Sequence, residues 1–142
     1  LEQEVSMQVS NAVNPTQEQL QKFLASDFTG PVAMLNLLKF STSAAYADGR
    51  ETDLTGQQAY ALYGQQMAPF VFSNGGKLLY SGSAEFTMLG EVEQLWDAVA
   101  IMEYPSKEAF VEIVAQPEVH KFAVHREAGL EGQLLIATSQ NV

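Results

Sequence analysis

The segment "VAMLNLLKF", Val32 to Phe40, limits the possible folds of this chain more than any other stretch. It is apolar along almost its whole length, without the alternation that marks a strand with one solvated face. Such a run is typical of a β-strand that is buried on both faces. The segment "LWDAVAIMEY" at 95–104 has the same character. Any sheet that contains both strands must therefore be covered on both sides.

Helix signals separate the predicted strands. Thr16 and Gln19 have the spacing of an N-terminal capping box, Thr55 and Gln58 repeat it, and Ser106 suits the N-cap of a third helix. The predicted elements are a helix at 16–28, a strand at 32–40, a helix at 55–73, strands at 77–89 and 95–104, a helix at 106–128 that a proline divides, and a strand at 133–138. This is the β-α-β-β-α-β order of an α+β, ferredoxin-like fold with an extra N-terminal helix.

The length of 142 residues predicts a single domain at 15–142, preceded by an N-terminal tail at 1–14. The first residues have neither the basic nor the apolar part of a signal peptide, so we expect none. No apolar run reaches the roughly 18 residues of a membrane-spanning helix. The sequence does not fix the compartment, although it favours the cytoplasm over the periplasm.

Charge and cysteine content exclude several classes of partner and reaction. Seventeen acidic residues against seven basic ones give a formal net charge of -10. This charge repels phosphate, so we expect neither nucleic acid nor an anionic membrane as a partner. The absence of cysteine excludes disulfide bonds and a thiol nucleophile. The chain also lacks a phosphate-binding loop and the Gly-x-Ser-x-Gly motif of hydrolases.

Three segments carry a family resemblance. "GPVAMLNLLKF", "YALYGQQMAPFVFSNGGKLLYSGS" and "WDAVAIMEYPSKEAFVEIVAQPEVHKFAVHREAGL" resemble, in this order, the DUF1330 proteins of the dimeric α/β-barrel superfamily. The likeness extends from Gly30 to Thr138, and the function of that family is unknown. The resemblance implies a homodimer whose sheets meet face to face, with a cavity between sheet and helices in each subunit. Relatives on this fold include cofactor-independent oxygenases, lactone isomerases, haem peroxidases and ligand-sensing domains, so the fold does not define the activity.

The two apolar strands agree with the implied dimer. The helices of a β-α-β-β-α-β unit cover one face of its sheet, while both strands are apolar on both faces. A second copy of the chain is the simplest cover for the remaining face. We therefore predict a homodimer across the sheet.

Both histidines lie on the last predicted helix. His120 and His125 are five residues apart, which separates them by about 140° around a helix axis. Histidines that bind one zinc ion from a helix have i, i+4 spacing, so we predict no metal site. The alternatives for the two side chains are a structural or solvated role, or acid–base chemistry at His125.

Arg126 continues the apolar stripe of the same helix and should point toward the sheet. A buried guanidinium needs an acidic or carbonyl partner, and Asp97 and Glu103 are the acids in the strand at 95–104. One interpretation is a structural ion pair between helix and sheet. The other is an arginine in a cavity wall that binds a carboxylate or enolate oxygen of a substrate.

Further polar and aromatic residues complete the candidate site. Asn36, in an apolar strand, either forms a buried hydrogen bond that specifies the fold or anchors a ligand. Tyr60 and Tyr63 lie on the helix stripe that faces the sheet, and Trp96 is a candidate for core or cavity lining. The long polar segment at 41–54 is either a mobile lid over a cavity mouth or a disordered connection.

These features predict a homodimer that binds a small, mostly apolar molecule. One hypothesis adds cofactor-independent acid–base catalysis, of the isomerase or oxygenase kind, with His125 or Asp97 as the base. The other is a non-enzymatic ligand-binding or accessory protein with the same cavity. We expect no cofactor, because nothing marks a proximal haem ligand. The ligand-binding candidates are Asn36, Tyr60, Tyr63, Trp96, Glu103 and Arg126.

Overall fold

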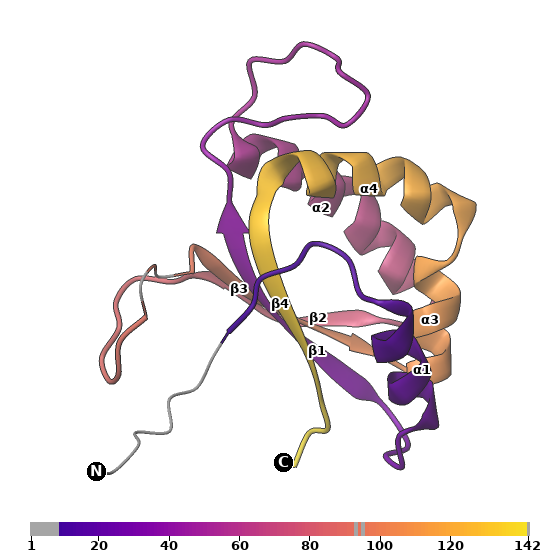
Figure 1. The fold of residues 1–142 in the computed structure, drawn as a ribbon. Helices are drawn as coiled ribbons and strands as arrows, with labels where there is room; N and C mark the ends of the chain where they lie inside the picture. The colour runs from indigo at the N-terminus through magenta and orange to yellow at the C-terminus, as the bar shows by residue number, and fades with distance from the viewer. Residues whose placement is uncertain (1–8, 93, 95, 142) are drawn as a thin grey trace.

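The computed structural model describes residues 9–92, 94 and 96–141, and within them one antiparallel sheet of four strands carries its helices on one face (Figure 1). The strands lie in the order β2-β3-β1-β4. The elements are α1 (Gln17–Ala25), β1 (Val32–Phe40), α2 (Gly56–Ser73), β2 (Lys77–Ser83), β3 (Ala98–Tyr104), α3 (Lys107–Val114), α4 (Pro117–Gly129) and β4 (Leu130–Thr138). The predicted α+β, ferredoxin-like fold with an extra N-terminal helix is confirmed.

Local sequence signals set the helix starts. Thr16 and Thr55 accept the backbone N–H groups of Gln19 and Gln58, whose side chains bond back to the N-cap backbone, so both predicted capping boxes form. Pro69 lies inside α2, and the helix continues beyond this proline to Ser73. The helix divided by proline becomes α3 and α4, and proline opens the second of them.

The predicted strand at 77–89 is too long, because β2 ends at Ser83. Directly after it, Ala84 N–H donates to Asp97 O at 2.9 Å, at the residue before β3 begins. The chain then leaves the sheet in a projecting loop (Figure 1). That loop exposes the large apolar side chains of Phe86, Met88 and Leu89, the last of them 92% exposed.

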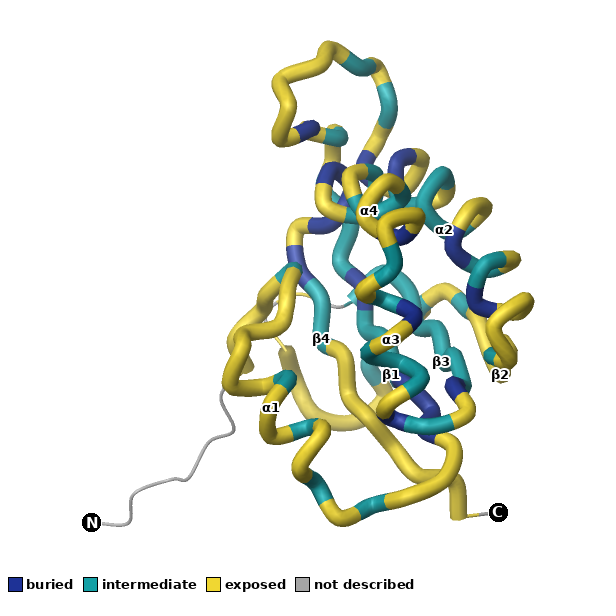
Figure 2. The backbone as a smooth tube through the Cα atoms, turned by 90° about the vertical axis from the view of Figure 1, so that its right-hand side faces the viewer, coloured by how far each residue is buried: buried dark blue, intermediate teal, exposed yellow. Residues whose placement is uncertain are grey.

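The core lies between β1 and the helices, where the buried positions gather in Figure 2. Val32 and Val71 are fully buried, and each such side chain contributes on the order of 1.5–3 kcal/mol. Helices α2 and α4 approach closely where Gly56 meets Gly129. A Cβ atom on Gly56 would lie 2.6 Å from the Gly129 carbonyl oxygen, so this crossing requires glycine.

The opposite face of the sheet is apolar as well. Strand pairing places Leu35 beside Ile101 and Ile136, and Leu37 beside Val99, on the face turned away from the buried residues of β1. These side chains are half-buried or exposed, and Ile136 is 45% exposed. None of the described helices covers this face (Figure 1).

The end of the predicted N-terminal tail lies against β4. Ala12 and Gln133 exchange two backbone hydrogen bonds of 3.0 and 3.4 Å. Gly132 allows the approach, because a Cβ atom there would lie 2.8 Å from the Asn11 side chain. In the part of the chain that the structure describes, no helix has the length and hydropathy needed to cross a membrane.

Candidate functional site

Arg126 points toward the sheet, as its helix periodicity predicts, but the predicted ion pair with Asp97 or Glu103 is wrong. The guanidinium donates instead to Val13 O at 2.7 Å, Asn14 Oδ1 at 2.8 Å and Gln133 Oε1 at 3.0 Å.

Strand register explains this difference. Glu103 pairs with Ala33, and the Asp97 carboxylate binds Lys39, so both acids share the face of the sheet that carries no helix. Glu103 lies 3.7 Å from Lys77 on that face. Arg126 lies on the other face of the sheet and pairs with neither acid.

Asn36 joins the Arg126 network through a residue that the sequence analysis missed. Gln133 accepts from Arg126 with Oε1 and donates from Nε2 to Asn36 Oδ1 at 2.7 Å. The Asn36 amide also donates to the carbonyls of Met34 and Ala100, at 3.2 and 3.3 Å. These bonds occupy the Asn36 amide, in agreement with its structural interpretation.

Tyr60 and Tyr63 lie near Arg126, and Tyr104 lies near those two tyrosines. Tyr60 and Tyr63, on α2, have ring centroids 5.4 Å apart, and Phe40 lies 5.6 Å from Tyr60. Burial raises the pKa of both tyrosines, while the nearby charge of Arg126 acts to lower it. Burial, followed by the effect of the other two phenols, also raises the pKa of Tyr104. The sequence analysis did not single out this residue. All three phenols therefore stay protonated at neutral pH.

The hydroxyls of these tyrosines have no hydrogen-bond partner among the described residues. Every fully buried side-chain polar atom in the same residues does have a partner. It follows that the hydroxyls of Tyr60, Tyr63 and Tyr104 touch accessible space. The adjoining β4 is not sealed either, because Leu135, beside Asn36 on the helix face, is 44% exposed. We call Tyr60, Tyr63, Tyr104 and Arg126 the tyrosine–arginine cluster.

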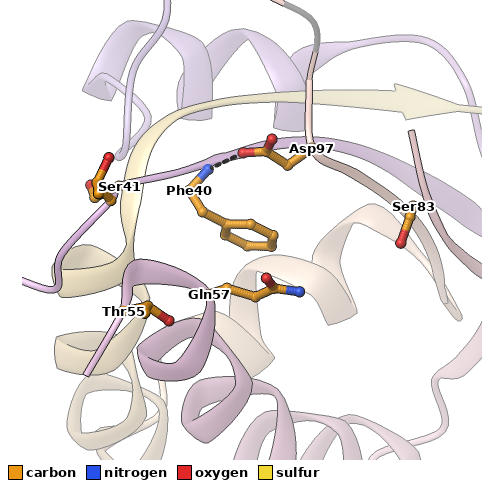
Figure 3. Close-up of a pocket in the computed structure, with 7 residues that line it drawn as sticks. Phe40, Ser41, Thr55, Gln57, Ser83 and Asp97 are labelled. Carbon is orange, nitrogen blue, oxygen red and sulfur yellow. Dashed lines mark hydrogen bonds between the residues drawn. The ribbon is translucent and has the colours of Figure 1, made fainter. Parts of the chain in front are cut away.

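Asp97 lies in a separate open pocket of about 390 Å³ (Figure 3). Its Oδ2 accepts from Phe40 N–H at 2.8 Å, and its Oδ1 binds Lys39 Nζ at 3.3 Å. These contacts brace the ends of β1 and β3. Trp96, its half-buried neighbour, also precedes β3. A smaller pocket of about 200 Å³ includes Glu103.

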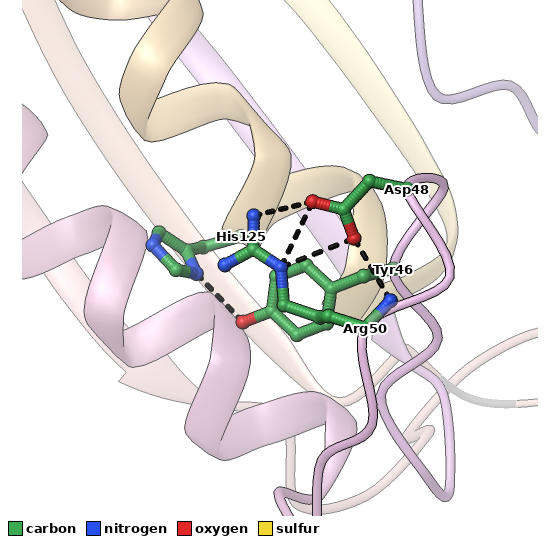
Figure 4. A network of polar contacts seen from close by, with 4 residues as sticks. All are labelled: Tyr46, Asp48, Arg50 and His125. Atoms are coloured by element: carbon green, nitrogen blue, oxygen red, sulfur yellow. Dashed lines mark hydrogen bonds and ion pairs between the residues drawn. The ribbon is translucent and has the colours of Figure 1, made fainter.

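His125 contacts the 41–54 segment instead of the cluster (Figure 4). Its Nδ1 lies 2.6 Å from the hydroxyl of Tyr46, whose ring is 9% exposed and packs edge-on against the imidazole. The Arg50 guanidinium lies 4.4 Å from the centre of the Tyr46 ring and is itself bonded to Asp48. Tyr46 was missed, although it is the one aromatic residue in this polar segment.

The base of the 41–54 segment is fixed to the end of α4. Ser41 N–H donates to Gly129 O at 2.8 Å, and Ala45 N–H donates to Ala128 O at 3.0 Å. Ser41 also lines the pocket beside Asp97. This bonding disagrees with a disordered connection, while opening of the segment as a lid stays a prediction.

His120 is exposed on α4. Among the described residues, no three histidine, aspartate or glutamate side chains are grouped so as to hold a metal ion. The sequence-predicted residues thus separate into three places. Asn36, Tyr60, Tyr63 and Arg126 lie between the sheet and α2 and α4, His125 contacts the 41–54 segment, and Asp97, Trp96 and Glu103 lie in or before β3.

Comparison with known proteins gives a family and a fold. A family model described as a domain of unknown function, DUF1330, matches residues 44–139. The chain is 40% identical to the methylated RPA0582 protein, whose crystal structure matches with a TM-score of 0.84 over 93% of this chain and 96% of that one. The crystal structure of RPA0582 from Rhodopseudomonas palustris, a protein of unknown function, gives 38% identity and a TM-score of 0.81 over 91% and 96% of the two chains. No curated protein matches.

Proposed function

Because the chain belongs to the DUF1330 family, whose function is unknown, we propose a function from the site itself: a homodimer that binds a small molecule at the tyrosine–arginine cluster. The observation that carries this proposal is the pair of phenol hydroxyls of Tyr60 and Tyr63, which have no hydrogen-bond partner among the described residues and lie beside the charge of Arg126. Because these hydroxyls touch accessible space, they can donate hydrogen bonds to a molecule bound there. Apolar walls with a few convergent polar groups are the usual form of a ligand site.

The placement of the candidate bases supports binding over acid–base catalysis. Asp97 lies on the far face of the sheet, where Lys39 and a backbone N–H occupy its carboxylate. His125 uses Nδ1 for Tyr46. A general base must reach the proton that it removes, directly or through one water molecule. The non-enzymatic alternative therefore agrees better with the geometry.

The uncovered face of the sheet supports the homodimer. Leu35, Leu37, Val99 and Ile101 form an apolar surface that no described helix covers. Such a surface is typical of protein interfaces. The loop at 84–92, which carries exposed apolar side chains, projects from the same sheet (Figure 1). In a symmetric dimer, the uncovered face of each subunit's sheet would cover that of the other subunit.

Ligand binding is tested by NMR with three small aromatic probes of different polarity: benzoate, benzamide and benzyl alcohol. We expect at least one probe to shift the resonances of Tyr60, Tyr63 and Arg126. The double variant Tyr60→Phe/Tyr63→Phe keeps both rings and removes both hydroxyls, so it should weaken that binding. Tyr80→Phe, in the exposed part of β2, is the matched control. If no probe of any kind binds at the cluster, the proposed function is wrong.

A further inference from the structure

The charge of Arg126 is not neutralised by any carboxylate in the described part of the chain. Its three described partners are neutral: the backbone oxygen of Val13 and the side-chain amide oxygens of Asn14 and Gln133. Asp97 and Glu103 are paired with lysines on the other face of the sheet. The described partners of this half-buried guanidinium therefore do not compensate its charge.

Hydrogen-bond donors are also in excess at the cluster. Arginine has five N–H groups, and the described partners of Arg126 use three of them. The side-chain oxygens of Gln133 and Asn36 already accept hydrogen bonds within the network. The three phenol hydroxyls add further donors without acceptors. A ligand that fits this site must therefore supply acceptor oxygens and negative charge.

The aromatic rings at the cluster favour a ligand with a flat apolar body. The rings of Phe40, Tyr60 and Tyr63 follow one another at centroid distances of 5.6 and 5.4 Å. Such rings pack well against another planar ring. Leu135 adds an exposed apolar side chain on the same face of the sheet.

We infer that the ligand of this site is a small carboxylate with a planar, aromatic body, whose carboxylate binds Arg126 and the tyrosine hydroxyls. This inference rests on the proposed ligand-binding function and adds the chemical class of the ligand. A carboxylate matches a guanidinium in shape and charge and accepts phenol donors at the same time. The protein as a whole carries a charge of -10 and repels anions, so specific binding of an anion would have to come from a local site such as this one.

The test is titration calorimetry with the matched probes benzoate and benzamide, which share size and shape but differ in charge. Wild-type protein should bind benzoate at least about tenfold more tightly than benzamide, since hydrogen bonds to a charged group are the stronger ones. Arg126→Gln should remove this preference. Arg126→Lys keeps the charge and should retain part of it. Lys121→Gln makes the same change of charge at an exposed position of α4 and should leave benzoate binding unchanged.

Several outcomes would overturn the inference. Equal binding of benzamide and benzoate at the cluster would exclude an anionic ligand and leave the proposed ligand-binding function standing. Unchanged benzoate affinity in Arg126→Gln would exclude Arg126 as the anion contact. Failure of every probe to bind would contradict the ligand-binding function as well. Thermal melts of each variant confirm that it is folded before it is titrated.

Discussion

Replacing Gly56 by alanine should destabilise the protein strongly, because α2 and α4 cross at this residue. A Cβ atom there would lie 2.6 Å from Gly129 O and 2.7 Å from Ser41 N, and still closer to Ser41 O. Carbon and carbonyl oxygen approach to about 3.3 Å even in favourable contacts. The backbone would therefore have to move by at least roughly 0.7 Å at the point where both helices and the 41–54 segment are fixed.

Overpacking of this kind costs about 1–3 kcal/mol, and we expect the upper end because all three neighbours are backbone atoms. Gly64 is a matched control on the same helix. A Cβ atom at Gly64 would meet nothing within 4 Å, so Gly64→Ala should gain about 0.5–1 kcal/mol from helix propensity.

Urea denaturation of the two variants gives the free energies of unfolding directly. The same chemical change should thus shift stability in opposite directions at two positions of one helix. If Gly56→Ala is as stable as wild type, or if both variants lose stability equally, the close helix crossing is not present in solution.

Three further outcomes are expected. Leu37→Arg, on the uncovered face of the sheet, should convert a dimer into a particle near the 15.5 kDa of one chain, as measured by light scattering; a wild-type monomer at micromolar concentration would refute the dimer. Arg126→Ala and Asp97→Ala should change the free energy of unfolding additively within about 0.5 kcal/mol in urea melts, because the two residues lie on opposite faces of the sheet. Strong coupling between the two changes would show that these residues form an ion pair after all. The raised pKa of Tyr60 and Tyr104 means that the unfolded chain loses these protons first, so stability should fall as pH rises above 10.0, and less steeply in Tyr60→Phe. An equal slope in the variant would contradict the burial of that phenol.

Much of the fold could be predicted because local signals determine it. The capping boxes at Thr16 and Thr55 set two helix starts, and the apolar run of β1 defines an inner strand of the sheet. Side-chain periodicity also predicted that Arg126 points toward the sheet. These features depend on residues close together in the chain.

The errors arose where distant segments meet. Periodicity places Asp97 and Glu103 on one face of β3, but only strand register and helix placement decide which face the helices cover. The length of β2 depends on how far β3 continues beside it, and the residues of β2 alone do not determine this. Tyr46 and His125 are 79 positions apart, so nothing local pointed to their hydrogen bond.

Gln133 and Tyr104 were missed for a similar reason. Each looks ordinary in its own strand. Gln133 matters because the fold brings Arg126 beside it, and Tyr104 matters because the fold brings Tyr60 and Tyr63 near it. The orientation of Arg126 was predicted, but two of its partners, Val13 and Asn14, lie in the segment that the sequence analysis had treated as a tail.

The most direct test of the account is the Nε–H resonance of Arg126 in the intact protein, followed by NMR as benzoate is added. That N–H has no recorded partner in the described chain, so a bound carboxylate should shift it strongly while Arg50, held by Asp48, stays unchanged. Saturable shifts of Arg126 together with Tyr60 and Tyr63 are the predicted result. If Arg126 is unchanged while residues of the pocket beside Asp97 shift, the ligand binds elsewhere and the central claim is wrong.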